Sequence, residues 1–562
     1  MIEMVAEPTE EDHKFEWVEY NELRGNMYLE MQNWALDKFF EVYISDNGDG
    51  TFTNPVLYCD YSDPDAIRVG EDYYLVASSF TNTPGLPILH SKDLVNWNLI
   101  NYCVKNVPED VSSFRKPRHG EGVWAPSIRY HDGLFYVCFP MPDEGIYMTT
   151  ASDPYGVWSE PVNIRPGAGW IDPCPFWDDD GKVYLVSGVA KSRIGYNSVL
   201  YVTELASDAM SVKGEPVKVF DGNQTGDRTT EGPKLYKRNG YYYIFAPAGG
   251  VKPGYQLVLR SRNIYGPYEK RIVLKQGSSD INGPHQGAWV DTPKGDNWFL
   301  HFQDVYAAGR IVHLQPMTFE DDWPVIGKKI EGECCGEPVR TYKKPLEVAS
   351  YNEKETTNPG ITDLYLRGWQ WNANHEDSWI TNENDDESIT LYCNYDEKER
   401  YIPELPCILL KKWEAPEFEH TYKLDLSQLC KGDYVGVINL GMSYLAVVFE
   451  KKEDKIVASS ISGRQEFTDG GILYNESETE ICSDVPHHVY IKYEVKNIGM
   501  RKEKEIPVAP EEIVRYYMSY DGKDYNKVAE ISAEAGRWVG VKQGVFALSH
   551  NEASNGRLIV AL

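Results

Sequence analysis

Several features that define common protein classes are missing from this 562-residue sequence. No apolar run reaches the roughly 20 residues that cross a bilayer as a helix, and the first 20 residues lack the basic start and apolar stretch of a secretory leader. Positive charge is scarce, because 56 Lys and Arg face 86 Asp and Glu, and the formal net charge of −30 repels nucleic acids and anionic membranes. We therefore expect no nucleic-acid or membrane partner, and a cytoplasmic location unless a leader has been removed.

Metal-ligand spacing is also missing from the ten cysteines. Cys138 in LFYVCFP, for example, lies in an apolar, strand-like run where a free thiol packs as a small hydrophobic group. The adjacent Cys334 and Cys335 could form a redox pair, but we interpret them as structural thiols. This usage is typical of a reducing compartment.

Long stretches with helical periodicity are nearly absent, whereas short runs of β-branched and aromatic residues recur between Gly, Asp, Asn and Pro. The chain is therefore predicted to be all-β. Five segments share one pattern, in which a polar or aromatic residue precedes a strand, a turn and an aromatic strand. They are DPDAIRVGEDYYLVASS from Asp63, WAPSIRYHDGLFYVCFP from Trp124, DPCPFWDDDGKVYLVSG from Asp172, EGPKLYKRNGYYYIFAPA from Glu231 and HQGAWVDTPKGDNWFLHFQ from His285.

Each repeat contains a hairpin turn, such as His-Asp-Gly, Asp-Asp-Gly or Arg-Asn-Gly, between its two strands. The repeat starts are 61, 48, 59 and 54 residues apart, slightly longer than a four-stranded propeller blade needs. This spacing predicts a five-bladed β-propeller over residues 51–330. Because the blades are arranged radially, the five repeat starts should converge near the central axis.

The repeat pattern ends after WPVIG, and a charged stretch follows. We predict a linker over 331–359 and a β-sandwich over 360–562, of the concanavalin or laminin-G-like jelly-roll type, from runs such as SITLYC, YVGVINLG, YLAVVFEK and HVYIKYEV. Residues 1–50 are assigned to an N-terminal extension.

Three of the five repeat starts are carboxylates, namely Asp63, Asp172 and Glu231. Either Asp-Pro pair alone would be ordinary turn chemistry. Three acids in one register are harder to explain by stability, because like charges raise one another's pKa. Cleavage of a glycosidic bond needs two carboxyl groups, one to protonate the leaving oxygen and one to activate water or attack the sugar.

The strings NPVLYCDYSDPDAIRVGEDYYLV, WAPSI, WIDPCPFWDDDGKVYL, TEGPKLYKRNGYYYIF and GRIVHLQPMTFEDDWPVIG occur in order across about half of the chain. This set resembles glycoside hydrolase family 43. The region that begins YLRGWQWNANHEDSWI is similar to the β-sandwich appended to many β-xylosidases of that family.

The resemblance implies a role for each acid. Asp63 matches the general base, Asp172 the acid that tunes the pKa and orients its partner, and Glu231 the general acid. It also implies inversion at the anomeric carbon, which needs roughly 6.5 to 9.5 Å between base and acid to hold a water. Arg310 matches an arginine that contacts the substrate, and Trp124 an aromatic residue of the sugar subsite.

Other positions agree less closely with the resemblance. Phe80 lies where the relatives have an aromatic-rich TFEWFPG, but Asn82 and Thr83 replace those aromatics and leave the shape of the subsite open. His285 matches an axial histidine that in parts of the family faces calcium or water, so a structural Ca²⁺ on the propeller axis is considered, although Ca²⁺ prefers oxygen ligands. No cofactor is expected to be required.

We therefore expect an exo-acting, inverting β-xylosidase that releases terminal xylose from xylo-oligosaccharides. One alternative is an α-L-arabinofuranosidase acting on arabinose side chains, because the same acids serve both reactions in the family. Another is a non-catalytic, carbohydrate-binding propeller. The relatives of this two-domain form use a sandwich loop to close the pocket, and the same is expected here. The sequence leaves a homo-oligomer open.

Overall fold

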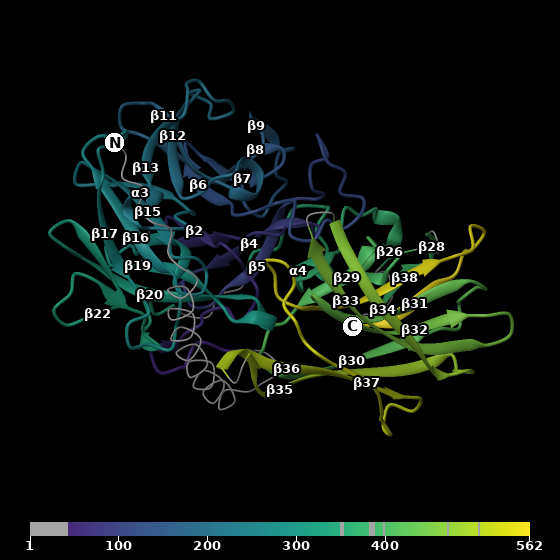
Figure 1. Cartoon of the computed structure of the whole chain (residues 1–562). Helices are drawn as coiled ribbons and strands as arrows, with labels where there is room; N and C mark the ends of the chain where they lie inside the picture. Colours follow the sequence, from purple (N-terminus) through teal and green to yellow (C-terminus); the bar gives the residue numbers. More distant parts are fainter. Residues whose placement is uncertain (1–42, 349–352, 382–387, 397–399, 469–470, 504–505) are drawn as a thin grey trace, which may run out of the picture.

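The computed structural model describes residues 43–348, 353–381, 388–396, 400–468, 471–503 and 506–562. Most of the predicted N-terminal extension lies outside these residues. The chain forms a five-bladed β-propeller and a C-terminal β-sandwich that lie side by side (Figure 1). Both predicted folds are confirmed. In the described part of the chain, no helix is long and apolar enough to cross a membrane.

Five antiparallel sheets form the blades, and in each the strands follow one another in chain order. Blade one contains β2 (Asp65–Val69), β3 (Asp72–Val76), β4 (Gly85–Ser91) and β5 (Asn98–Val104). Blade two contains β6 (Ser127–His131), β7 (Leu134–Met141), β8 (Gly145–Ala151) and β9 (Val162–Pro166). Blade three contains β10 (Trp170–Trp177), β11 (Val183–Val189), β12 (Val199–Leu205) and β13 (Val217–Asp221). Blade four contains β14 (Lys234–Arg238), β15 (Tyr241–Ala248), β16 (Tyr255–Ser261) and β17 (Glu269–Leu274), and blade five contains β18 (His285–Asp291), β19 (Asn297–Asp304), β20 (Arg310–Glu320) and β21 (Trp323–Ile326).

The first two strands of every blade form the hairpin that the repeats predict. The segment predicted as a linker contains two short strands that tie it to the propeller. β23 (Gly336–Glu337) adds to the sheet of blade four together with β22 (Lys328–Lys329), and β24 (Thr341–Lys343) pairs with β1 (Thr51–Thr53). Backbone hydrogen bonds therefore hold the segment in which the chain leaves the propeller next to the segment in which it enters.

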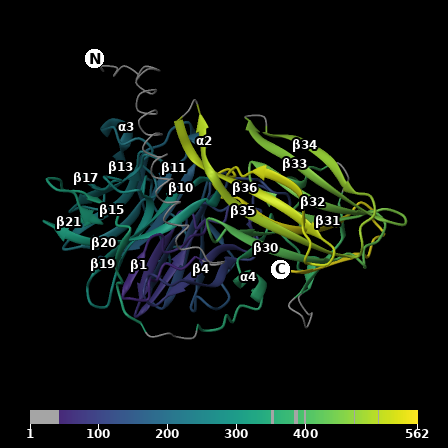
Figure 2. The same ribbon diagram turned by 90° about the horizontal axis from the view of Figure 1, so that it is seen from below.

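Two sheets form the sandwich. The first contains β25 (Trp369–Trp371), β28 (Asn394–Tyr395), β29 (Ile408–Lys412), β31 (Asp433–Leu440), β32 (Ser443–Lys451), β33 (Ile456–Thr468), β34 (Gly471–Cys482) and β38 (Lys542–Ser549). The second contains β26 (Ile380–Thr381), β27 (Ile389–Tyr392), β30 (Phe418–Asp425), β35 (His488–Glu503), β36 (Ile506–Ser519), β37 (Asn526–Ser532) and β39 (Arg557–Ala561). Figure 2 shows β35 and β36 passing close to the propeller, and Arg501 donates to the Tyr306 hydroxyl there at 2.8 Å.

Helices are confined to single turns in the described residues. They are α2 (Lys191–Ile194), α3 (Gly222–Thr225), η1 (Tyr306–Ala308), α4 (Asp363–Leu366), η2 (Asp377–Trp379) and η3 (Ile402–Glu404). All ten cysteines are free thiols.

The core of the propeller is divided into five apolar clusters, one between each pair of adjacent blades, including blades five and one. Central strands such as β4 and β11 are buried along their whole length, because each blade is packed on both faces. The ring of blades therefore closes by side-chain packing.

The two domains share a continuous apolar core. The largest cluster of the sandwich extends into the propeller and includes Tyr58, Tyr102, Val305 and Ile311. Backbone hydrogen bonds cross the interface as well, for example from Trp371 to Thr83 at 2.6 Å. An interface of this kind fixes the position of one domain on the other.

Candidate active site

The five repeat starts lie near one end of the propeller axis, as their common register predicts. Four of them, Asp63, Trp124, Asp172 and Glu231, line one cavity of about 380 Å³, and His285 contacts one of those four. The rest of the lining comes from Phe80, Ala125, Ile171, Val189, Ala190, Lys191, Ser192, Asn197, Thr229, Gly250, Val251, Gln286, Arg310 and Trp538. Apolar walls around a few converging polar groups are typical of a binding site for a small molecule.

Asp63 is held rigidly just before β2. One carboxylate oxygen accepts from the hydroxyls of Ser62 at 2.8 Å and Ser78 at 2.6 Å, and the other accepts from the Arg310 guanidinium at 3.0 Å. The side chains of Asp63 and Arg310 are each only 9% exposed. Four lone-pair sites therefore meet three donors, which leaves acceptor capacity for one more O–H group at this carboxylate.

Asp172 lies inside β10, at a bulge in its pairing with β11. Its Oδ2 accepts from the backbone N–H of Gly232 at 2.7 Å. Burial, followed by the negative charge of Glu231, raises the pKa of Asp172 to about 7. The donor is a glycine for a steric reason, because φ is +57° at Gly232 and a Cβ there would lie 2.4 Å from the Gln286 side chain.

Glu231 is the most exposed of the three acids, with a side chain 25% accessible. His285 Nε2 lies 2.7 Å from Glu231 Oε1, whereas His285 Nδ1 is buried without a partner. An unprotonated Nδ1 is the less costly arrangement, so we assign the proton to Nε2, which donates to the carboxylate. His285 thereby orients Glu231.

The geometry around His285 also tests the predicted calcium. The Nε2 atom is already bonded to Glu231, and the remaining Nδ1 is a nitrogen, whereas Ca²⁺ takes oxygen ligands. Among the residues that the structure describes, no group of three or more His, Cys, Asp or Glu is arranged to hold a metal. The described residues therefore do not fit a directly bound calcium, and no step below uses one.

The backbone is strained at several residues that line the cavity. Asp63, Phe80 and Asp172 have φ of 56°, 54° and 53°, in the left-handed region that non-glycine residues seldom adopt. Asp tolerates this region better than Phe. Strain of this kind persists where the surroundings hold it, and it concentrates at functional sites.

Trp124 and Phe80 form the aromatic part of the wall. Trp124 is half-buried and its indole N–H donates to the Gly120 carbonyl at 3.1 Å, and Arg193 lies over its ring. The replaced positions after Phe80 face the other domain. Asn82 donates to the Trp371 carbonyl at 3.1 Å, and Thr83 donates to the Ala373 carbonyl at 2.6 Å. These polar residues therefore serve the domain interface.

Sequence reasoning missed several residues of the cavity, among them Gln286 and Trp538. Gln286 lines the cavity, is 5% exposed, and has an Oε1 that is buried without a hydrogen bond. Trp538 comes from the loop between β37 and β38, so the sandwich contributes directly to the cavity, as the expected closing loop requires. A tryptophan in the glycine-rich string AGRWVGVKQG is the signal that could have indicated it.

A propeller with three carboxylates, an arginine and aromatic walls at one end of its axis defines a glycoside hydrolase site. Comparison with known proteins agrees. Residues 52–324 match the model of glycosyl hydrolases family 43, and residues 364–558 match the β-xylosidase C-terminal concanavalin A-like domain. The chain belongs to glycosyl hydrolase family 43.

Proteins similar to this chain are named as β-xylosidases and as arabinofuranosidases. A putative β-xylosidase from Xylanibacter ruminicola is 37% identical over 501 residues, which cover 89% of this chain and 86% of that protein. A non-reducing end α-L-arabinofuranosidase from Bacteroides ovatus is 33% identical over 50% of this chain and 54% of that protein. The crystal structure of the GH43 protein BlXynB from Bacillus licheniformis has a TM-score of 0.72 at 25% identity, covering 91% of this chain and 98% of that one.

Proposed function

We propose that this glycoside hydrolase is an exo-acting, inverting β-xylosidase that releases terminal xylose from xylo-oligosaccharides. The observation that carries the proposal is one cavity in which Asp63 and Glu231 come from blades one and four and Trp538 comes from the sandwich. A cavity walled by both domains suits a chain end better than the middle of a chain. The overall similarity to a putative β-xylosidase supports the choice of sugar.

The proposed chemistry follows from the contacts of each acid. Asp63 accepts three hydrogen bonds and would take a proton from water as that water attacks the anomeric carbon. Glu231, the more exposed acid, would donate its proton to the leaving oxygen. Asp172 would hold the backbone of the Glu231 segment through Gly232 and disfavour a second negative charge beside it.

The experiment compares nitrophenyl β-D-xylopyranoside and nitrophenyl α-L-arabinofuranoside at matched concentrations. We expect a higher kcat/KM for the xyloside. A higher value for the arabinoside would favour the arabinofuranosidase, which is the activity named for the Bacteroides ovatus relative. If neither substrate is turned over, and xylo-oligosaccharides are not cleaved either, the hypothesis of a non-catalytic, carbohydrate-binding propeller would be favoured.

The stereochemical course is a second test. Inversion predicts that α-xylose is the first sugar released from nitrophenyl β-D-xylopyranoside, observed by NMR before mutarotation. A β-anomer, or a sugar trapped covalently on Asp63, would contradict the assignment of Asp63 as a base.

A further inference from the structure

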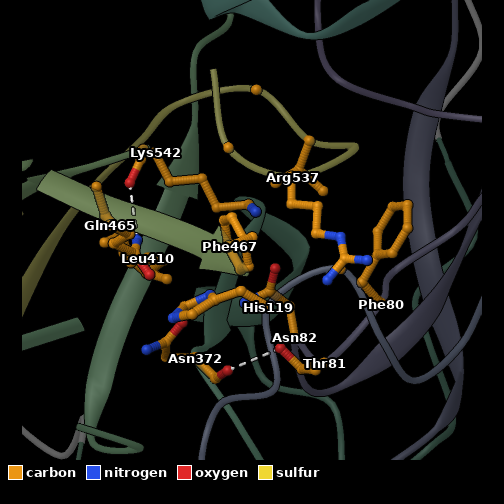
Figure 3. A pocket seen from close by; sticks show the side chains of 16 residues that line it. Phe80, Thr81, Asn82, His119, Asn372, Leu410, Gln465, Phe467, Arg537 and Lys542 are labelled. Atoms are coloured by element: carbon orange, nitrogen blue, oxygen red, sulfur yellow. Dashed lines mark hydrogen bonds between the residues drawn. The ribbon is translucent and has the colours of Figure 1, made fainter. Parts of the chain in front are cut away.

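A second cavity lies at the junction of the two domains, behind the Phe80 wall of the active-site cavity. Its lining combines the propeller loops around Phe80 and His119 with the sandwich loop that contains Arg537 (Figure 3). The full lining is Phe80, Thr81, Asn82, His119, Gly120, Asn372, Leu410, Leu440, Gly441, Gln465, Phe467, Gly536, Arg537, Val539, Gly540 and Lys542. It contains two basic side chains, Arg537 and Lys542, and no carboxylate, in a protein with 86 Asp and Glu.

Lys542 is the unusual member of this lining. Its side chain points into the cavity in Figure 3, and the residue is 7% exposed. Within the part of the chain that the structure describes, its ammonium group forms no hydrogen bond or ion pair. A buried ammonium without a partner is costly, because burial removes its hydration and nothing replaces it.

The neighbouring charges make this position still less favourable for a protonated Lys542. Lys542 begins β38 and lies directly opposite Lys412 of β29, and like charges at opposed strand positions are destabilising. Lys412 has a partner, because its ammonium donates to the Asp60 carbonyl at 2.6 Å. The Asp60 carboxylate accepts hydrogen bonds from the backbone N–H groups of Arg310 at 2.9 Å and Gly540 at 2.8 Å, and in the described residues it receives none from Lys542.

Arg537 provides the second cation. Its guanidinium forms no ion pair in the described residues, and its Cζ lies 5.2 Å from the centre of the Phe467 ring. Figure 3 shows its side chain extending toward Phe80. Arg537, from the loop before β38, and Lys542, at the start of β38, therefore both border the domain-junction cavity.

We propose that this domain-junction cavity binds a small monovalent anion of about the size of chloride, held by Lys542 and Arg537. The volume supports a small occupant, because the cavity measures about 30 Å³, whereas one water needs about 10 to 15 Å³. An anion would neutralise the buried ammonium and accept hydrogen bonds from it. It would also join the sandwich loop to the propeller at the domain interface.

Protonation of Lys542 gives the site a pH dependence. Burial, with a smaller opposing effect from Asp60 and a reinforcing one from Lys412, lowers the pKa of Lys542 to about 8. The other titratable groups nearby are His119, whose pKa burial lowers to about 4, Arg537, and the Cys59 thiol, whose charge would raise the pKa of Lys542. Halide affinity should therefore fall about tenfold per pH unit above pH 8, as the ammonium loses its proton.

The first experiment measures thermal unfolding of the full chain with increasing sodium bromide, with sodium gluconate keeping the ionic strength constant. Gluconate is too large for the cavity. We expect the unfolding midpoint of the wild type to rise with the logarithm of bromide concentration, and that of Lys542→Met to be independent of bromide. Lys213→Met, which removes an exposed lysine paired with Glu204, should respond like the wild type.

The second experiment locates the ion. Anomalous diffraction from crystals soaked in bromide should show a peak within hydrogen-bonding distance of Lys542 Nζ in the wild type and none in Lys542→Met. If Lys542→Met does not fold, Arg537→Gln takes its place and should weaken bromide binding about tenfold. A wild-type peak that is absent, a water at that position, a bromide response that survives in Lys542→Met, or an unchanged bromide affinity in Arg537→Gln would overturn the proposal.

Discussion

The propeller and the sandwich are both built from β-strands, but they use their strands differently. Central strands of the propeller, such as β4 and β11, are buried on both faces, and the core is divided into five clusters between blades. Strands of the sandwich alternate more often, as in β30, and most of its core is one cluster that continues into the propeller. Function follows this difference, because radial sheets bring five strand starts to one axis, whereas the sandwich contributes a loop residue, Trp538, to the active-site cavity.

The comparison also separates two kinds of contribution to the active site. The propeller contributes charged groups held by short hydrogen bonds, such as Asp63 and Arg310. The sandwich contributes Trp538, which is 48% exposed and has a positive φ of 66°. Chemistry should therefore depend on the propeller and substrate affinity on the sandwich.

The largest effect is expected from the two reacting acids of the propeller. Asp63→Asn and Glu231→Gln should each reduce turnover by about two to four orders of magnitude, the usual effect of losing an acid or base. Circular dichroism and the unfolding midpoint should stay close to the wild type. Near-normal turnover in either variant would refute the assigned roles.

Removal of the sandwich should have the next largest effect. A chain that ends after residue 348 keeps β24 but exposes Tyr58, Tyr102, Val305 and Ile311 to water. Loss of this contiguous apolar contact should cause aggregation, loss of activity on xylobiose, or both. Size-exclusion chromatography and xylobiose assays measure this. A monodisperse, fully active propeller would show that the sandwich is not needed.

Each domain contains a buried acid with a raised pKa, so the pH dependence of stability can be compared between the two domains. Asp172 in the propeller has its pKa raised to about 7 by burial, and Glu512 in the sandwich has its pKa raised to about 8 by burial. A raised pKa means that the folded state binds the proton more tightly, so stability is present at low pH and is lost as pH rises toward the folded pKa. Between pH 5 and 7 each acid should lower the free energy of unfolding by about 2 to 3 kcal/mol.

Urea denaturation of Asp172→Asn and Glu512→Gln at several pH values tests this expectation. Each variant should lose part of the downward slope of stability with pH. The loss for Glu512→Gln should extend to about pH 8, because that is its pKa in the folded protein. An unchanged slope in both variants would mean that neither acid keeps its proton on folding.

The smallest effect is expected from the sandwich residue in the cavity. Trp538→Ala should reduce kcat/KM about tenfold, mainly through KM, because it removes an aromatic wall and no reacting group. Tyr395→Ala, an exposed aromatic of the sandwich outside the cavity, should have no effect. A large loss of kcat in Trp538→Ala would contradict the division of roles between the domains.

Much of the architecture was predictable from the sequence because each blade repeats one local pattern. The hairpin turns and the shared register at Asp63, Asp172 and Glu231 are local signals, and radial symmetry converts them into a common site. The strands at 336–337 and 341–343 were not predictable, because they are too short to show a pattern and depend on pairing with distant residues.

The sequence by itself determined the class of fold, the position of the candidate acids and the family, because these depend on repeats and on motifs that are continuous in the chain. Only the tertiary structure decided that His285 bonds Glu231, that Asn82 and Thr83 face the sandwich, and that Lys542 lies opposite Lys412 in a cavity without carboxylates. These contacts join residues between about 50 and 290 positions apart in different blades and domains. Long-range packing, which leaves no periodic trace in a sequence, sets them.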